Sequence, residues 1–299
     1  MLSLEQVRGF VAVAEEGNFH RAAQRLRMTQ PPLSRQIQRL EREVGVVLFD
    51  RTQRKVELTP AGTAFLAEAR RLLALAAAAP DTARRVAQGH TGTVRIGFTA
   101  ASGLGFLGRF LNHLERELPE VRLILNEMIT SDQLESLRNA TLDLALARPP
   151  FDEDEFDSRL VHSEPLVLAI PRHHRLADET TAVAVDALGQ ETLLVYTSDQ
   201  AGYFANLVSR VLAGVPYVSA HRLTQVHTML ALVAAGRGLA LVPEAATHLH
   251  PDGVLFRTLA GVADAPAVLH AVWRREPFNP ALRRAITLLG SLPDKDGDI

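Results

Sequence analysis

The sequence contains no cysteine among its 299 residues. This absence excludes a disulfide framework, thiolate metal sites and cysteine nucleophiles. The chain also lacks a run of about 18 apolar residues and a basic-then-apolar leader with a small-residue cleavage site. We therefore expect neither a membrane span nor a secretory signal, and the expected location is the cytoplasm.

The usual signatures of catalysis and metal binding are missing as well. No G-x-S-x-G, P-loop or H-E-x-x-H motif occurs. The pairs His173-His174 and His248-x-His250 lack a carboxylate at a recognisable metal spacing, so we expect exposed histidines. The acidic run 151–157 is interpreted as a solvated segment that connects two compact lobes of the chain. We predict no catalytic residues, no metal site and no cofactor.

One motif, by contrast, is typical of dinucleotide-binding enzymes. Gly103, Gly105 and Gly108 have the G-x-G-x-x-G spacing after a strand-like run, and Glu127 lies where a ribose-binding acid would be expected. In a dinucleotide fold, however, the first glycine makes the tight turn directly after the strand. Here residues 99–102 intervene. The phosphate turn would therefore start four residues late, which argues against a dinucleotide site.

The charge is unevenly distributed along the chain. The length allows roughly two domains, and the composition, 47% apolar and 22% charged, is that of a globular protein. Residues 18–55 carry nine basic and three acidic groups, a local +6, although the whole chain is −2, so the remainder is −8. A compact basic segment on an acidic body is typical of a nucleic-acid-binding head, although an ordinary solvated face can look similar.

Segment 18–62 begins with the pattern of two short helices joined by a brief turn. Apolar residues recur at helical spacing in each: Phe19, Ala22, Ala23 and Leu26, then Leu33, Ile37, Leu40 and Val44. Thr29 suits an N-cap and Pro31 suits the first turn, where a missing N–H costs little. This is the helix-turn-helix arrangement, whose second helix enters the major groove N-terminus first.

Polar and basic side chains occupy the outward face of the second helix. Arg35 can pair bidentately with guanine and Gln38 with adenine. Residues 47–58 are expected to form a two-stranded wing whose basic side chains bind the phosphate backbone. A plain helical hairpin is the alternative. The predicted DNA-contacting residues are Gln30, Pro31, Ser34, Arg35, Gln38, Arg39, Arg51 and Arg54.

Residues 19–62, FHRAAQRLRMTQPPLSRQIQRLEREVGVVLFDRTQRKVELTPAG, resemble the winged head of the LysR-type transcriptional regulators. They share the Ala-Ala pair, the Thr-Gln-Pro turn, the Leu-Ser-Arg-Gln start of the recognition helix and the Leu-Phe-x-Arg before the wing. The resemblance continues through the chain. It implies an α/β architecture with a winged helix-turn-helix DNA-binding domain at 1–58, a linker and dimerisation helix at 59–89, and a two-lobed, periplasmic-binding-protein-like effector domain at 90–299.

The linker also has a helix pattern of its own. Thr59 suits a cap, Pro60 suits the first helical position, and residues 61–79 are rich in Ala and Leu. Apolar residues recur at heptad-like spacing, as in a dimer seam or in a satisfied core helix: Phe65, Leu66, Ala69, Leu72, Leu73 and Ala76. The resemblance favours dimerisation. Pro80 is expected to kink the helix or to precede a new one near Asp81.

Strands and helices alternate in the rest of the chain, which predicts a mostly parallel sheet. The expected elements are strand 93–98, helix 104–117, strand 121–127, helix 131–138 and strand 142–147. We place lobe I at 90–163 and 268–299, and lobe II at 164–267. Two crossings between lobes imply a cleft at a hinge, where a small ligand binds.

The runs NEMITSDQLESL and DLALARPP are similar to the branch of the family that responds to muconate-like and chlorinated aromatic breakdown products. By position, Thr130 and Arg148 would meet an acidic ligand, and Arg offers a bidentate fork to a carboxylate. We expect a small effector bearing a carboxylate. The predicted effector contacts are Thr99, Ala101, Ser102, Thr130, Arg148, Ser198, Tyr203, Phe204, Gln225 and His227.

Three functions remain open. The leading one is a ligand-responsive transcription factor that binds double-stranded promoter DNA as a homo-oligomer, a dimer or tetramer, and changes DNA bending when its effector binds. RNA polymerase is a further expected partner, and a membrane is not. The alternatives are an enzyme that uses the cleft for turnover and a constitutive DNA-binding protein with a vestigial cleft.

Overall fold

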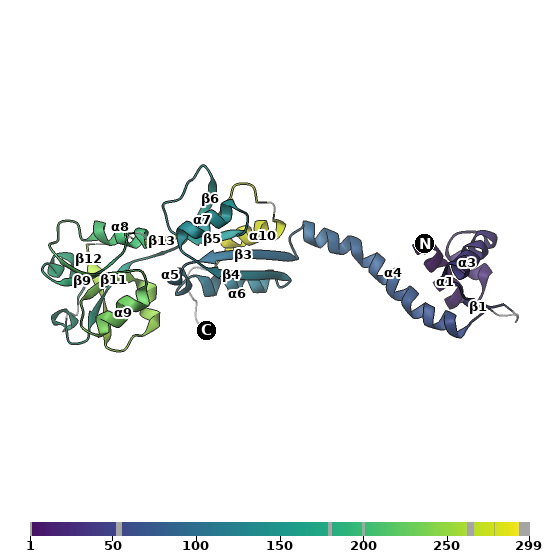
Figure 1. The fold of residues 1–299 in the computed structure, drawn as a ribbon, viewed down its shortest axis with the longest axis horizontal. Coiled ribbons are helices and arrows are strands. Elements are labelled where there is room, and N and C mark those ends of the chain that lie inside the picture. Colours follow the sequence, from purple (N-terminus) through teal and green to yellow (C-terminus); the bar gives the residue numbers. More distant parts are fainter. Residues whose placement is uncertain are drawn as a thin grey trace. The chain divides into compact units, whose positions relative to one another are not determined.

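The computed structural model describes residues 2–51, 56–178, 181–198, 201–261, 266–277 and 279–292. The chain divides into two compact units, Met1–Arg85 and Val86–Ile299 (Figure 1). Each unit has its own core. Within the described ranges, the helices are all too short or too polar to cross a bilayer.

The first unit is a three-helix head with a small two-stranded wing. Its elements are α1 (Leu4–Glu16), α2 (Phe19–Arg25), α3 (Gln30–Val44), β1 (Phe49–Asp50) and β2 (Glu57–Leu58), and the two strands are antiparallel. Ser3 and Gln6 form a capping box at the start of α1. Phe10 lies at the centre of the core, with ring centroids 5.1 Å from Phe49 and 5.0 Å from Phe65. These contacts fix the helices against the wing.

Helix α4 (Pro60–Ala87) follows the wing, and the boundary between the two units falls within it. The predicted cap is confirmed: Thr59 Oγ1 accepts a hydrogen bond of 2.9 Å from the Gly62 amide. Of the two alternatives for Pro80, the new helix near Asp81 is wrong, because α4 continues through Pro80, and the kink stays a prediction. Alanine, the strongest helix former, fills the turn before Pro80, and the exposed surroundings let water satisfy the carbonyl that proline leaves unpaired.

The apolar stripe of α4 has two different environments. Ala69 is buried, and Phe65, Leu66 and Leu73 pack against the core of the head. Leu72 and Leu75, by contrast, are 41% and 70% exposed. The first part of the stripe therefore behaves as a core helix, whereas the side chains at Leu72 and Leu75 remain on the surface.

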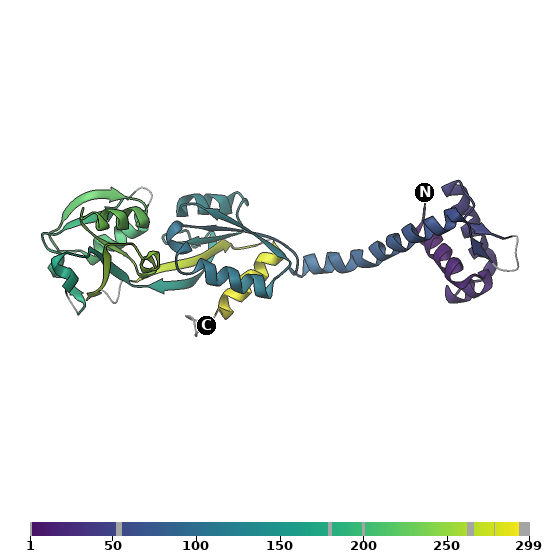
Figure 2. The ribbon, with the colours of Figure 1, turned by 90° about the horizontal axis from the view of Figure 1, so that it is seen from below.

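The second unit begins with a five-stranded sheet. Its strands in spatial order are β4 (Val121–Glu127), β3 (Gly92–Phe98), β5 (Leu144–Ala147), β13 (Ala267–Arg274) and β6 (Phe156–Glu164). β3 pairs in parallel with β4 and β5, whereas β13 is antiparallel to β5 and β6. Helices α6 (Leu107–Glu117) and α10 (Pro280–Leu288) cover one face, and α7 (Thr130–Arg138) packs on β5 (Figure 2).

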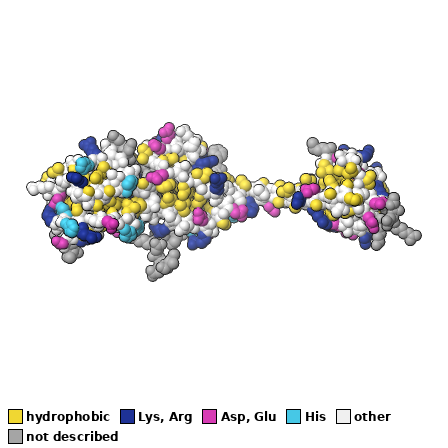
Figure 3. Space-filling view, turned by 60° about the horizontal axis from the view of Figure 1, so that its bottom comes forward, with side chains coloured by type: hydrophobic (Ala, Val, Ile, Leu, Met, Phe, Trp, Pro, Cys, Tyr) yellow, Lys and Arg dark blue, Asp and Glu magenta, His cyan; other side chains and the backbone are white. Residues whose placement is uncertain are grey.

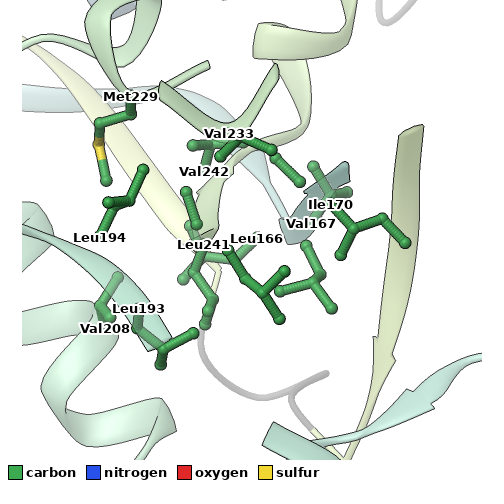
Figure 4. Close-up of a cluster of buried hydrophobic side chains, with 14 of the residues drawn as sticks. Leu166, Val167, Ile170, Leu193, Leu194, Val208, Met229, Val233, Leu241 and Val242 are labelled. Carbon is green, nitrogen blue, oxygen red and sulfur yellow. The ribbon is translucent and has the colours of Figure 1, made fainter. Parts of the chain in front are cut away.

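A six-stranded sheet forms the second lobe of this unit. Its strands in spatial order are β10 (Val218–Leu223), β9 (Thr192–Tyr196), β11 (Leu239–Pro243), β7 (Leu166–Pro171), β12 (Val254–Ala260) and β8 (Val183–Ala184). Helices α8 (Gly202–Val211) and α9 (Val226–Ala234) pack on it. Val208 of α8 and Met229 of α9 meet the buried leucines of β9 and β11 in one apolar core (Figure 4).

The chain crosses between the two sheets twice. β6 leads through Pro165 into β7, and β12 is followed by β13 on the return. The acidic run 151–157 does not connect the lobes, contrary to our interpretation. Phe156 in this run is 2% exposed and begins β6 inside the first sheet, so burial of its aromatic side chain places the run within the first lobe.

Candidate functional site

The DNA-facing candidate is the outward side of α3. Leu33, Ile37 and Leu40 are fully buried, as predicted, and anchor the opposite side of the helix in the core. Val44, predicted to be buried, is 36% exposed, because it lies in the last turn before Gly45 ends the helix with a φ of 81°. Thr29 occupies the N-cap position, but its side chain makes no capping hydrogen bond.

Most predicted DNA-contacting residues lie on this outward side. Gln30, Pro31, Arg35, Gln38 and Arg39 are exposed, as is Arg51 beside the wing, and Ser34 is half-buried. Arg54 lies outside the described residues. The side chains of Arg35 and Gln38 make no hydrogen bond or ion pair with any described residue.

Glu41 links the recognition helix to the wing, a role that the sequence did not suggest. Its Oε1 accepts hydrogen bonds from the amides of Leu48 at 2.9 Å and Phe49 at 3.2 Å. Its Oε2 lies 2.8 Å from Arg51 Nη2. The guanidinium of Arg51 also lies over the ring of Phe19, 5.4 Å from its centroid. One carboxylate therefore holds α3, β1 and a basic side chain in a fixed arrangement.

A cavity of about 780 Å³ lies between the two lobes of the second unit. Its walls come from the loops after β3, β4 and β5 on one side and from the segments that start α8 and α9 on the other. Ligands in open α/β sheets bind at these carboxyl ends of strands. A cavity of this volume is large enough for a small organic ligand.

Nine of the ten predicted effector contacts line this cavity. They are Thr99, Ala101, Thr130, Arg148, Ser198, Tyr203, Phe204, Gln225 and His227. Ser102 does not line it. Its side chain is 2% exposed and bonds within a capping box formed with Thr99, where it donates to the Thr99 carbonyl at 2.8 Å.

Arg148 is engaged in a buried network. Its Nη2 lies 3.3 Å from Glu164 Oε1, and its Nη1 donates to the carbonyl of Val268 at 2.9 Å. The guanidinium lies 4.6 Å from the centroid of the Phe204 ring and 5.4 Å from that of Tyr203. Both Nη atoms of Arg148 therefore already have protein partners, whereas Nε has none among the described residues, and the carboxylate contact expected for Arg148 stays a prediction.

Three helices begin at the cavity, and among the described residues their N-cap side chains form no capping hydrogen bond. The residues at the starts of α7, α8 and α9 all belong to its lining, and the N-cap residues Ile129, Ala201 and Gln225 make no side-chain capping bond. The first amides of a helix have no partner inside the helix and carry a partial positive charge. The cavity thus offers three sets of N–H donors suited to an anion.

Tyr196, Glu127 and Asp132 also line the cavity, although our sequence-based prediction omitted them as contacts. Glu127 and Asp132 are exposed at its edge, where water screens their charge. Tyr196 is 4% exposed. Tyr196 ends the strand TLLVY, whose apolar pattern predicts a buried core strand. The pattern therefore does not indicate that Tyr196 lines the cavity.

The glycine motif has an ordinary structural explanation. Thr99 follows β3 directly and caps a short helix, α5 (Ala100–Gly103), and Gly108 lies inside α6. No phosphate-type turn therefore follows the strand. Over the described ranges, His, Asp and Glu never gather in the groups of three that a metal ion needs. His173 and His248 are exposed, whereas His174 is half-buried and lies 3.3 Å from Glu191.

The fold and the two sites define a DNA-binding regulator with a small-molecule-binding domain. Residues 4–63 match the model of the bacterial regulatory helix-turn-helix protein, lysR family, and residues 87–292 match the LysR substrate binding domain. The chain belongs to the LysR family of transcriptional regulators. Its relatives are named as regulators rather than enzymes, which sets the enzyme alternative aside.

Individual relatives agree over nearly the whole chain. The HTH-type transcriptional regulator AlsR of Bacillus subtilis (strain 168) is 32% identical over 95% of this chain and 94% of its own length. The HTH-type transcriptional regulator ClcR of Pseudomonas putida is 34% identical, with 96% and 98% covered. A crystal structure of full-length CbnR complexed with its target DNA is 28% identical, with a TM-score of 0.87 and 97% and 99% covered.

Proposed function

We propose that this regulator binds a small metabolite bearing a carboxylate in the cavity between its lobes, and that binding changes the bend it imposes on promoter DNA. The muconate-like and aromatic-degradation acids suggested by the sequence motifs are the ligand class that fits. The observation that carries the proposal is the convergence of three uncapped helix N-termini on one cavity.

These N-termini replace Arg148 as the anchor of the carboxylate. Backbone amides at a helix start bind anions without any basic side chain, because the N–H groups and the helix dipole act together. The hydroxyls of Thr99 and Thr130, which line the same walls, supply further donors. Apolar neighbours such as Leu104, Ile129 and Val226 suit the hydrocarbon body of such an acid.

The exposed side of α3 supports the proposed contacts with promoter DNA. Arg35 and Gln38 would read base edges from the major groove, while Arg39, Arg51 and Arg54 would bind the phosphate backbone. Gln30, Pro31 and Ser34, at the start of the helix, would lie nearest the bases. CbnR, a protein of the same fold, has been crystallised on its target DNA, and this supports the assignment.

Self-association through α4 belongs to the same proposal. Leu72 and Leu75 are exposed on this helix, and hydrophobic side chains are visible along its surface (Figure 3). Burying them between two copies would stabilise a dimer, because apolar area is removed from water. Two such dimers would make the tetramer that we propose acts on paired sites in the cytoplasm, where promoter DNA and RNA polymerase are found.

A pair of substitutions at the start of α9 tests the carboxylate. Asn and Asp both cap helices well, so Gln225→Asn and Gln225→Asp should fold equally. Only Asp places a negative charge beside the proposed carboxylate site. We would screen small organic acids by thermal shift, together with their primary amides, and titrate the best acid into each variant. We expect Gln225→Asp to weaken binding of the acid at least tenfold and Gln225→Asn to change it less than threefold.

Two results would contradict this account. Equal stabilisation by the acid and its amide would show that the protein does not recognise the charge of the ligand. Equal affinity for the acid in the two variants would show that the start of α9 does not contact it. The same incubations, analysed by mass spectrometry, distinguish a regulator from an enzyme, since a regulator returns its ligand unchanged.

A further inference from the structure

Two residues that line the cavity carry buried hydrogen-bond donors without a partner among the described residues. Tyr196 ends β9, lines the cavity and is 4% exposed. Its hydroxyl has no hydrogen-bond partner among the described residues, and neither has Nε of Arg148, which lines the same cavity. A polar group buried in this way costs stability unless something else satisfies it.

Aromatic rings connect these two donors. The ring of Tyr196 stacks on Phe204, with centroids 5.1 Å apart and planes at 23°. Phe204 also contacts the guanidinium of Arg148, 4.6 Å from its ring centroid, and the ring of Tyr203, with centroids 5.3 Å apart. Both donors therefore belong to one rigid patch made of Tyr196, Phe204 and Arg148. A rigid patch holds its donors in place before a ligand arrives, which lowers the entropic cost of binding.

The Tyr196 hydroxyl acts as a donor at neutral pH. Burial raises the pKa of Tyr196 far above its usual value, and the nearby Glu164 carboxylate raises it further, although the Arg148 guanidinium opposes this effect. The phenol thus keeps its proton. The guanidinium of Arg148 and the carboxylate of Glu164 neutralise one another, with Nη2 and Oε1 3.3 Å apart.

We propose that the Tyr196 hydroxyl and Arg148 Nε–H form a specificity subsite for an uncharged oxygen acceptor of the ligand, such as a ketone, ester or ether oxygen. A second carboxylate would be disfavoured, because Glu164 already balances Arg148 and a further buried anion would be uncompensated. Within the proposed ligand class, this favours acids with one carboxylate over dicarboxylates such as muconate itself. This inference rests on the proposed function of the cavity. The ligand then has two ends, a carboxylate at the helix N-termini and a neutral oxygen on the aromatic patch.

Five probes test the two ends separately. Acetophenone and ethylbenzene differ by one carbonyl oxygen and carry no carboxylate. 4-Acetylbenzoate and 4-ethylbenzoate repeat this difference with a carboxylate, and terephthalate replaces the acetyl group by a second carboxylate. Binding of each to the full-length protein is measured by calorimetry. We expect each acetyl compound to bind about tenfold more tightly than its ethyl partner, as one hydrogen bond allows, and terephthalate to bind less tightly than 4-acetylbenzoate.

Tyr196→Phe removes the donor and keeps the ring. It should abolish the preference for acetyl over ethyl without weakening the ethyl compounds. The matched control is Tyr217→Phe, which removes a phenol that is half-buried in the second lobe and does not line the cavity. This control should retain the preference.

A second measurement needs no ligand at all. If the hydroxyl of Tyr196 serves only a ligand, Tyr196→Phe should leave the Tm of the ligand-free protein unchanged or raise it by roughly 2–4 °C. A fall in Tm of that size would show that the hydroxyl holds the fold together, and this would overturn the proposal.

The outcomes distinguish this inference from the proposed function. If acetyl compounds show no advantage in the wild type, or keep it in Tyr196→Phe, the subsite is refuted while carboxylate binding stands. If acetophenone binds as tightly as 4-acetylbenzoate, the carboxylate site is refuted while the subsite stands. Failure of all five probes to bind contradicts both.

Discussion

Arg148 Nη2 lies 3.3 Å from Glu164 Oε1, and each side chain is only 3% exposed. The same carboxylate accepts a hydrogen bond of 2.8 Å from the Ala245 amide, and Arg148 donates to the carbonyl of Val268. These partners lie after β5, at the end of β6, after β11 and in β13. The ion pair therefore ties the first lobe to the crossing strands and to the second lobe.

This geometry predicts a large loss of stability when one partner is removed. Arg148→Ala leaves a buried carboxylate uncompensated and should lower the free energy of unfolding by about 3–5 kcal/mol. The double variant Arg148→Met with Glu164→Leu should lose less than Arg148→Ala alone, since no charge remains buried. Urea denaturation of the full-length protein measures both.

The exposed pair of Arg71 and Glu68 in α4 is the matched control. Its side chains are 76% and 66% exposed at an N–O distance of 3.1 Å, and Arg71→Ala should cost at most about 1 kcal/mol. Equal losses for Arg148→Ala and Arg71→Ala would refute the structural role of the buried pair. A weak ligand response of Arg148→Ala does not identify a ligand contact unless stability is measured alongside.

Arg35→Ala should relax base preference at one operator position by about 1–3 kcal/mol. The physical reason is the loss of a guanidinium that projects from the exposed side of α3. Arg54 is a predicted phosphate contact, so Arg54→Ala should instead weaken binding to all DNA sequences alike. Mobility-shift titrations on an operator selected from random duplexes, and on a scrambled duplex, measure the difference. Undiminished operator preference in Arg35→Ala would refute the assignment.

Glu41→Ala should loosen the wing. It leaves the amides of Leu48 and Phe49 without their acceptor and frees Arg51. We expect faster hydrogen exchange in peptides that cover residues 44–51, and a loss of about 1–3 kcal/mol in stability. Glu68→Ala, which removes the exposed partner of Arg71 in α4, is the control and should leave exchange in those peptides unchanged. Equal hydrogen exchange and equal stability in the two variants would contradict the role of Glu41 in holding the wing.

The position of His270 predicts sensitivity to acid. Burial lowers the pKa of His270 below its ordinary value of 6.5, although Glu153 acts in the opposite direction. The unfolded chain therefore takes up the proton first as the pH falls below about 6.5, so stability declines until the lowered pKa is reached. His270→Gln should make stability less dependent on pH between 7.5 and 5, whereas exposed His173→Gln should not. Identical pH profiles for wild type and His270→Gln would contradict this assignment.

Sequence patterns predicted the helices and strands more accurately than the hydrogen bonds and ion pairs between them. Helical periodicity located the buried side of α3 at Leu33, Ile37 and Leu40, because local spacing determines which face is apolar. The strands predicted at 93–98 and 121–127 correspond to β3 and β4. The family resemblance, carried over by position, also led to nine cavity-lining residues.

Partners distant in sequence could not be predicted in this way. Glu164 lies 16 residues from Arg148 and Val268 lies 120 residues away, and nothing in their local patterns indicates that they meet. The ion pair of Arg148 with Glu164 could not be located from the sequence, since only tertiary packing brings the two residues together. The helix predicted at 104–117 begins only at Leu107, as α6, and the separate short helix α5 precedes it. Thr99 and Ser102 form a local cap at α5 that apolar spacing does not reveal.

The central claim is that a small carboxylate in the cavity changes how the protein holds DNA. A ligand shifts a conformational equilibrium only by its differential affinity for two states, and closed lobes contact it from both sides. The decisive measurement is a DNase I footprint on the selected operator, with and without the acid that most raises Tm. We predict an altered length or spacing of the protected region with unchanged base preference. Gln225→Asp should need a higher concentration of the acid to show this change than Gln225→Asn. A footprint that stays identical at saturating acid would contradict the account.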